Sequence, residues 1–208
     1  MNLENNGERM DIDYFNMKYE NFDIYQKSHY KRYEFAKTLM DDDDIVGDMA
    51  CGSGYGSMML LEKCKEVYSL DIDPITINEV ANRYKNENIH FVVGDLIDLK
   101  VENKFDKIVS FETLEHFTPN DLKKVIINFH KALKKDGKLI FSTPYNQEQS
   151  EASMRFHKTF YITENTINQF FKNLFEIDII KYQDYQTHTV KDDDGNKNFI
   201  IGVVKKIS

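Results

Sequence analysis

The sequence predicts an α/β protein with a doubly wound sheet of seven strands, mostly parallel and ending in an antiparallel hairpin. Short apolar segments alternate with amphipathic segments from residue 45 to residue 173, which is typical of parallel strands covered by helices. A glycine-rich turn, residues 52–56, follows the first apolar segment. The last two apolar segments have no helical segment between them, only KDDDGNKN. These two should therefore pair as an antiparallel hairpin.

Each element has its own local signal. Pro74 and Pro119 can each stand in the first turn of a helix. The run Asp41–Asp44 should end the first helix as a solvated loop rather than bind a metal. The predicted strands are Ile45–Ala50, Val67–Leu70, Ile89–Val93, Lys107–Phe111, Lys138–Ser142, Phe175–Lys181 and Asn198–Val204. The predicted helices are Ile24–Met40, one ending near Lys65, Pro74–Tyr84, Pro119–Lys134 and Thr163–Asn173.

The bulk properties predict one domain. A chain of 208 residues fits a single core, with residues 1–40 as an N-terminal cap and helix. Residues 145–162 are too long for a simple connection and should form a substrate loop. No apolar run approaches the length of a membrane span, and the start has no signal-peptide pattern. Cys51 and Cys64 form no CxxC pair, which favours a reduced, cytoplasmic setting.

The net charge of −8 bears on partners. Proteins that bind nucleic acid usually carry a basic surface that neutralises phosphates. The charge therefore disfavours nucleic acid as a partner and favours a small molecule or glycan. Oligomeric state has no signal in the sequence.

The glycine-rich turn predicts a nucleotide-type ligand. Glycines let the backbone approach a ligand closely, and the next helix offers unpaired N–H groups. Dinucleotide folds use GxGxxG, whereas Gly52, Gly54 and Gly56 are evenly spaced and Asp48 precedes them. An acid there would repel a pyrophosphate but attract the ammonium group of S-adenosylmethionine (SAM). SAM is therefore favoured over NAD.

Two further acids follow the next two strands. Asp71 ends the second strand, where a carboxylate can accept both hydrogens of a ribose diol. Asp95 follows the third strand, where it can meet the amino group of adenine. Each acid alone is as well explained as a turn residue, but three in succession at strand ends favour one ligand site.

These segments carry a resemblance. DMACGSGYG, SLDIDP, FVVGD, FDKIVSFETLEH and LKKDGKLIFSTP, in this order, resemble the class I, Rossmann-like SAM-dependent methyltransferases. The resemblance implies an enzyme of that class. It implies that the methionine end is held by Asp48 and the 50–54 turn, the ribose by Asp71, and the adenine by Asp95. The implied cofactor residues are Asp48, Ala50, Cys51, Gly52, Gly54, Asp71, Ile72, Asp95, Leu96 and Phe111. Ala50 stands where the family more often has glycine.

The segment after the fourth strand predicts a reaction site. Glu112, Glu115 and His116 would share one face of a helical turn, and such ligands suit a divalent cation. His157, in the predicted substrate loop, could be a general base, a further metal ligand, or a loop histidine with an ordinary hydrogen bond.

Two kinds of relative resemble this site. ExxEH with a later histidine is similar to small-RNA 3′-terminal 2′-O-methyltransferases and, in part, to ubiquinone-type O-methyltransferases. There a cation makes the attacked hydroxyl more acidic. Metal-free relatives carry a similar LEH that caps a helix or lines the pocket. Two alternatives stay open: Mg or Mn on Glu112, Glu115, His116 and His157, or metal-free catalysis with His157 and His116.

The N-terminal region favours one acceptor. Gly7-Glu8-Arg9 and the 29–36 segment resemble GER…HxxRYxFA, which occurs in bacterial methyltransferases found with sugar-nucleotide and glycan enzymes. The sequence therefore predicts O-methylation of a sugar, glycan or similar small polar acceptor. The alternatives are a quinone or phenol acceptor, an RNA ribose, and a non-catalytic SAM-binding regulatory subunit.

Overall fold

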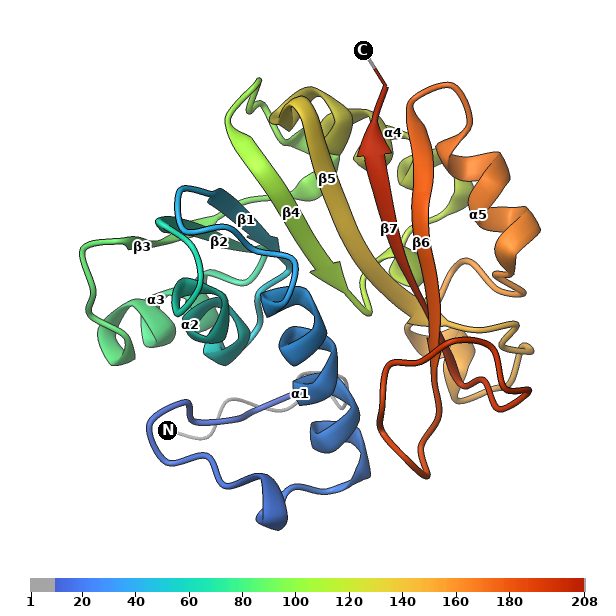
Figure 1. Cartoon of the computed structure of the whole chain (residues 1–208), viewed down its shortest axis with the longest axis horizontal. Coiled ribbons are helices and arrows are strands. Elements are labelled where there is room, and N and C mark those ends of the chain that lie inside the picture. The colour runs from blue at the N-terminus through green and yellow to red at the C-terminus, as the bar shows by residue number, and fades with distance from the viewer. Residues whose placement is uncertain (1–9, 208) are drawn as a thin grey trace.

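A computed structural model describes residues 10–207. Its seven strands form one sheet in the order β3-β2-β1-β4-β5-β7-β6, with β7 antiparallel to both neighbours (Figure 1). The predicted fold class is thereby confirmed. The strands are β1 (Ile45–Met49), β2 (Glu66–Asp71), β3 (Ile89–Val93), β4 (Phe105–Phe111), β5 (Leu133–Pro144), β6 (Phe175–Gln183) and β7 (Phe199–Lys206). The α-helices are α1 (Ile24–Lys37), α2 (Tyr55–Leu61), α3 (Pro74–Arg83), α4 (Pro119–Ala132) and α5 (Glu164–Phe171).

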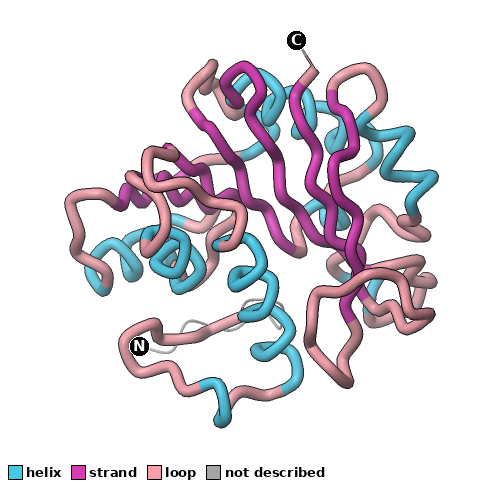
Figure 2. The backbone as a smooth tube through the Cα atoms, viewed as in Figure 1, coloured by secondary structure: helices cyan, strands magenta, loops and turns pink. Residues whose placement is uncertain are grey.

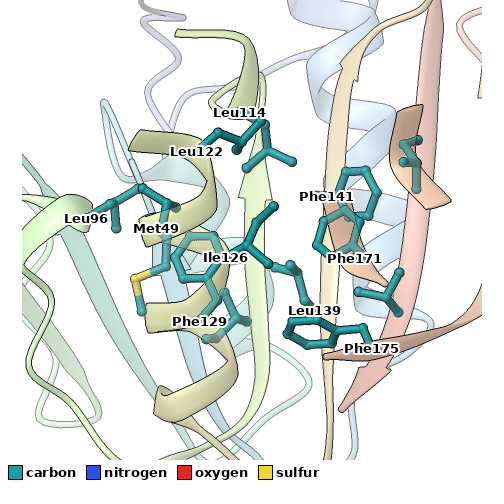
Figure 3. Close-up of a cluster of buried hydrophobic side chains, with 14 of the residues drawn as sticks. Met49, Leu96, Leu114, Leu122, Ile126, Phe129, Leu139, Phe141, Phe171 and Phe175 are labelled. Atoms are coloured by element: carbon teal, nitrogen blue, oxygen red, sulfur yellow. The ribbon is translucent and has the colours of Figure 1, made fainter. Parts of the chain in front are cut away.

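Helices cover both faces of the sheet (Figure 2). One hydrophobic cluster joins the sheet to α4 and α5 and contains Phe129, Phe141 and Phe171 (Figure 3). The other joins it to α1, α2 and α3, with Tyr33 and Met59 in its centre. Two buried layers of this kind make the framework that holds the strand ends in place. Within residues 10–207 no helix is long and apolar enough to cross a membrane.

Local capping explains where the helices begin. Asp23 caps α1 and exchanges hydrogen bonds with Gln26 in a capping box, which satisfies two of the unpaired groups of the first turn. Asp73 and Thr118 cap α3 and α4, and a proline follows each of them, as predicted. The local sequence therefore determines where these helices begin.

The ends of the helices differ more from prediction. Helix α1 ends at Lys37 rather than at residue 40, and α2 ends at Leu61 rather than near residue 65. The chain passes from α4 straight into β5 at Leu133, four residues before the predicted turn closes. Asp136 takes a positive φ of 63°, so the predicted turn becomes an irregularity inside a longer strand.

The aspartate run is not wholly a solvated loop. Asp44 is buried and pairs with the buried ammonium group of Lys107, which also donates to Asp41 at 2.7 Å. Lys107 lies in β4, so the pair joins the start of β1 to its neighbouring strand. The prediction was wrong for Asp44 because the partner lies more than sixty residues away along the chain.

Candidate active site

A cavity of about 860 Å³ opens where the parallel strands β1, β2, β4 and β5 end. Helix α1 and the loop between β6 and β7 lie at the same end of the sheet (Figure 1), and both contribute to the cavity wall. This is the usual place for a ligand in an open α/β sheet. The predicted site residues that line it are Ala50, Cys51, Gly52, Asp71, Ile72, Asp95, Leu96, Phe111, Glu112, Glu115, His116 and His157. Asp48 and Gly54 do not line it.

The glycine-rich turn has the backbone that glycine permits. Gly52 and Gly54 have φ of 51° and 71°, a region that side chains disfavour. A Cβ atom on Gly54 would lie 3.0 Å from the ring of Phe91. Ala50 adopts a similar φ of 66°, at a cost of about 1 kcal/mol. That cost is a physical reason for the family's preference for glycine at this position.

Gly56 serves a neighbouring helix rather than a ligand. A Cβ atom there would lie 2.0 Å from the ring of Tyr33 in α1, so only glycine lets the ring lie against α2. The Tyr33 hydroxyl donates to Asp48 Oδ1 at 3.0 Å, and Ser57 Oγ donates to Asp48 Oδ2 at 2.5 Å. Asp48 thus links the start of the glycine-rich turn to α1 on the side away from the cavity.

Asp48 is fully buried, and this burial raises its pKa to about 6 although both hydrogen bonds act to lower it. The sequence placed this carboxylate at the methionine end of the cofactor. The structure commits its two oxygens to Tyr33 and Ser57 and keeps it out of the cavity wall. What Asp48 does in this structure is hold α1 against the glycine-rich turn.

The other two predicted cofactor acids do face the cavity. Asp71 accepts the N–H of Gly52 on Oδ2 and that of Asp73 on Oδ1, both at 3.0 Å. These two bonds orient the carboxylate at the cavity wall. Asp95 accepts the N–H of Ile97 at 2.9 Å, which fixes it beside the same cavity.

Three of the predicted reaction-site residues converge. Glu115, His116 and His157 each offer a ligand atom, and these atoms lie within 4.8 Å of one another. Glu115 is 1% exposed, and its Oε2 has no hydrogen-bond partner among the described residues. Burial and then the nearby Glu112 carboxylate raise the pKa of Glu115 well above its usual range. A buried acceptor left unpaired costs about 1–3 kcal/mol, so this oxygen suits a proton or a cation.

Backbone hydrogen bonds bring His157 to this place. The N–H groups of Lys158 and Thr159 both donate to the carbonyl of Glu115, at 2.7 and 3.0 Å. The Thr159 hydroxyl also donates to the carbonyl of Phe117, at 2.8 Å. The 145–162 loop is thereby pinned to the turn after β4, and the rings of His116 and His157 stand 5.1 Å apart.

His157 is neutral at pH 7. Burial and then the adjacent His116 lower its pKa to about 4. A neutral imidazole has one nitrogen with a lone pair. It can therefore accept a proton from a hydroxyl or bind a cation.

Glu112, the fourth residue of the predicted set, lies outside the cluster that the other three form. Its Oε1 lies 3.0 Å from Nη1 of the buried Arg32 and accepts the Ser142 hydroxyl at 2.7 Å. The expected α-helical turn is a 3₁₀ turn over Leu114–His116, and Glu112 precedes it with φ of 48°. The i, i+3, i+4 face on which the prediction rested is therefore not formed.

Helix α1 supplies site residues that sequence reasoning had not assigned. Besides Arg32, it brings His29, whose Nδ1 lies 2.6 Å from Tyr55 Oη, and Tyr25, whose ring packs on Tyr185 at 5.4 Å. All of these line the cavity. The sequence analysis noted the 29–36 segment only for its resemblance. The packing of α1 against the rest of the protein is what places His29 and Arg32 at the cavity wall. Gly7, Glu8 and Arg9, the other part of that pattern, lie outside the described residues.

Comparison with known proteins identifies the central segment. Residues 46–137 match a family model described as a methyltransferase domain. They hold the glycine-rich turn, both predicted cofactor acids that face the cavity, and the turn with Glu115 and His116. The prediction of a SAM-dependent methyltransferase is confirmed at the level of this domain, and SAM is the methyl donor consistent with it.

Similar proteins include two malonyl-(acyl-carrier protein) O-methyltransferases. The Acetivibrio thermocellus protein is 30% identical over 62% of this chain and 47% of its own length. The Priestia megaterium protein is 26% identical over 62% of this chain and 49% of its own. The chain thus spans about half the length of the curated relatives it matches.

Solved structures share the fold around this domain. The chain solved with the Haloferax volcanii methyltransferase activator Trm112 superposes with a TM-score of 0.74, at 16% identity over 88% of this chain and 91% of that one. The N-methyltransferase NodS of Bradyrhizobium japonicum, in complex with S-adenosyl-L-homocysteine, gives 0.69 at 16% identity, over 91% and 90%. These likenesses show that the chain shares its fold with both structures.

Proposed function

We propose that this chain transfers the methyl group of SAM to a hydroxyl of a sugar, glycan or similar small polar acceptor. One observation carries the proposal. A single cavity is lined both by the predicted cofactor residues, such as Asp71 and Asp95, and by the trio Glu115, His116 and His157. Donor and acceptor groups can therefore meet without leaving the protein.

The cofactor end fits SAM, which supplies a methyl group on a positively charged sulfur. Gly52 brings backbone without a side chain to the cavity wall, and Asp71 presents an oriented carboxylate to a ribose diol. Asp95 and Leu96 lie where an adenine would need one polar and one apolar contact. The negative charge of both acids suits a cationic cofactor.

The trio fits a divalent cation such as Mg²⁺ or Mn²⁺, which would lower the pKa of an acceptor hydroxyl. Supporting this are the unpaired Oε2 of the buried Glu115 and the neutral state of His157. Glu115, His116 and His157 would hold the ion. Without an ion, the same His157 nitrogen can take the hydroxyl proton directly.

The acceptor would enter between segments outside the family match. We propose that residues 145–162 are the substrate loop and that residues 1–40 cap the cavity, within one domain spanning residues 1–208. Tyr25 and Tyr185 present aromatic faces at the cavity wall, and such faces can pack on a sugar ring. A phenol or quinone would use the same rings, so the acceptor needs direct testing.

A carboxylate acceptor is the second candidate. Several similar proteins are named malonyl-(acyl-carrier protein) O-methyltransferases. In addition, Arg155 and Lys197 line the cavity. Each also pairs with a nearby carboxylate, Glu151 and Asp193 respectively, which an acidic acceptor would have to displace. This candidate needs no acidified hydroxyl, so it predicts activity that does not depend on the trio.

The test is methyl transfer from isotopically labelled SAM by chelator-treated protein, with and without Mn²⁺. The acceptors are nucleotide sugars, a catechol, a short RNA and a malonyl thioester. Labelled nucleotide sugar, with turnover raised by Mn²⁺, is the expected result. Labelled malonyl ester alone would replace the first candidate by the second. SAM binding without labelling of any acceptor would support a regulatory subunit.

A further inference from the structure

Gln147 contacts the imidazole of His157 from inside the same loop. Its Oε1 lies 2.6 Å from His157 Nδ1, and both residues line the cavity. The amide oxygen of glutamine only accepts hydrogen bonds. A contact this short therefore requires the proton of the neutral imidazole to sit on Nδ1.

The backbone holds Gln147 firmly in place. The N–H of Tyr161 donates to the carbonyl of Gln147 at 3.1 Å, and the N–H of Asn146 donates to the carbonyl of Ile162 at 2.8 Å. These bonds close the base of the 145–162 loop. Asn146 and Tyr161 both have positive φ there, 47° and 57°, and such strain persists where the surroundings fix a conformation.

The same loop contacts the other histidine in the same way. His116 Nδ1 lies 3.3 Å from the carbonyl oxygen of Phe156, the residue before His157. A carbonyl also only accepts, so this contact places the His116 proton on Nδ1 as well. In the neutral ring of His157 the lone pair is then on Nε2. Histidines that bind metals or protons are commonly oriented by such a bond from the other nitrogen.

We propose that Gln147 is a positioning residue that fixes His157 in its Nδ1–H form, so that Nε2 is the atom that receives a proton or a cation. The inference deepens the proposed function and rests on it for the use of Nε2. The tautomer itself can be observed without any reaction. Gln147 lies outside the residues that match the family model, which end at residue 137. No sequence motif indicated a role for it.

The experiment is nitrogen NMR of the chelator-treated protein labelled with ¹⁵N-histidine, in which the shifts of Nδ1 and Nε2 report the tautomer. His157→Gln assigns the signal among the six histidines. We expect Nδ1–H in the wild type. Gln147→Leu removes the acceptor and should return His157 to the Nε2–H form that free histidine prefers. Gln147→Glu keeps an acceptor and should keep Nδ1–H. Gln149→Leu, an exposed position of the same loop, is the matched control and should change nothing.

Mn²⁺ titration of the same variants gives a second measurement. Loss of an orienting partner typically weakens metal binding 10–100-fold, so Gln147→Leu should bind Mn²⁺ about that much more weakly than Gln147→Glu or Gln149→Leu. An Nε2–H signal in the wild type, or Nδ1–H retained in Gln147→Leu, would overturn the inference. If the wild type binds Mn²⁺, equal affinity in all variants would also overturn it. A wild type that shows Nδ1–H but binds no Mn²⁺ would support the inference for proton transfer while removing the cation from the proposed function.

Discussion

The two ends of the cavity, which we propose hold the cofactor and the acceptor, are built in different ways. At the cofactor end, Ala50, Asp71 and Asp95 each stand at or within two residues of a strand end. Their positions follow from the strands alone, because parallel strands end at one edge. At the acceptor end, Arg32 comes from α1 and His157 from the 145–162 loop, and both reach the turn after β4.

This difference predicts which property a substitution changes at each end. Local backbone geometry maintains the cofactor end, so a single side chain there changes mainly ligand affinity. The acceptor end depends on a few long-range contacts, so a change there should affect chemistry or folding. Four substitutions test this contrast, in order of decreasing expected effect.

Glu115→Ala should have the largest effect. It removes the buried carboxylate of the trio, and the loss of an acid–base or ligand group typically lowers turnover about 10²–10⁴-fold. SAM affinity, measured by calorimetry, should be nearly unchanged because Glu115 is not among the predicted cofactor residues. Glu148→Ala, an exposed position, is the control. Undiminished turnover in Glu115→Ala, with and without chelator, would contradict the role given to the trio.

Arg32→Ala should destabilise the protein by about 3 kcal/mol, because it leaves Glu112 with an uncompensated charge. It also removes the 2.9 Å bond from Arg32 Nε to Gln183 Oε1 in β6. Urea unfolding measures the change. Lys37→Ala, in the same helix, breaks a more exposed pair with Glu62 and should cost under about 1 kcal/mol. Equal losses in the two variants would contradict the stabilising role given to the Arg32–Glu112 pair.

Asp71→Ala should weaken SAM binding about 10–100-fold, since charge-assisted hydrogen bonds contribute about 1.5–3 kcal/mol. Stability should change less than in Arg32→Ala, because the cofactor end keeps its backbone. Calorimetric titration of SAM gives the affinity. Asp98→Ala, at an exposed position in the turn after β3, serves as control. If both variants bind SAM as the wild type does, Asp71 is not the ribose ligand.

Asp48→Asn should give the smallest effect, visible as a change in pH dependence. The pKa of Asp48 is raised to about 6 in the folded protein, above the value of about 3.9 in an unfolded chain. The folded state therefore binds this proton more tightly, and wild-type stability should fall as pH rises from about 4 to about 6. Asn lacks the ionisation, so its unfolding free energy should gain on the wild type across that window. Parallel pH profiles would contradict the burial of a charged Asp48.

The acceptor and the cofactor end also differ in how far sequence could predict them. The doubly wound sheet, its terminal hairpin and the cavity-facing Asp71 and Asp95 were all predicted. Glu115, His116 and His157 were predicted as candidates together with Glu112, which lies instead beside Arg32. The helical spacing assumed for Glu112 depends on backbone angles that the residue types do not dictate.

By itself, the sequence determined the features that follow from hydrophobic periodicity and from the position of particular residues at the ends of elements. Alternating apolar segments gave the strands, proline and aspartate gave the helix starts, and the glycine-rich turn with two later acids gave the cofactor end. Only the tertiary structure decided that Asp48 accepts a hydrogen bond from Tyr33, that Asp44 pairs with Lys107, and that Glu112 pairs with Arg32 outside the trio. Each of these pairs joins residues from different elements. The free energy of burying a charge selects such partners, and that selection is made only when the elements pack.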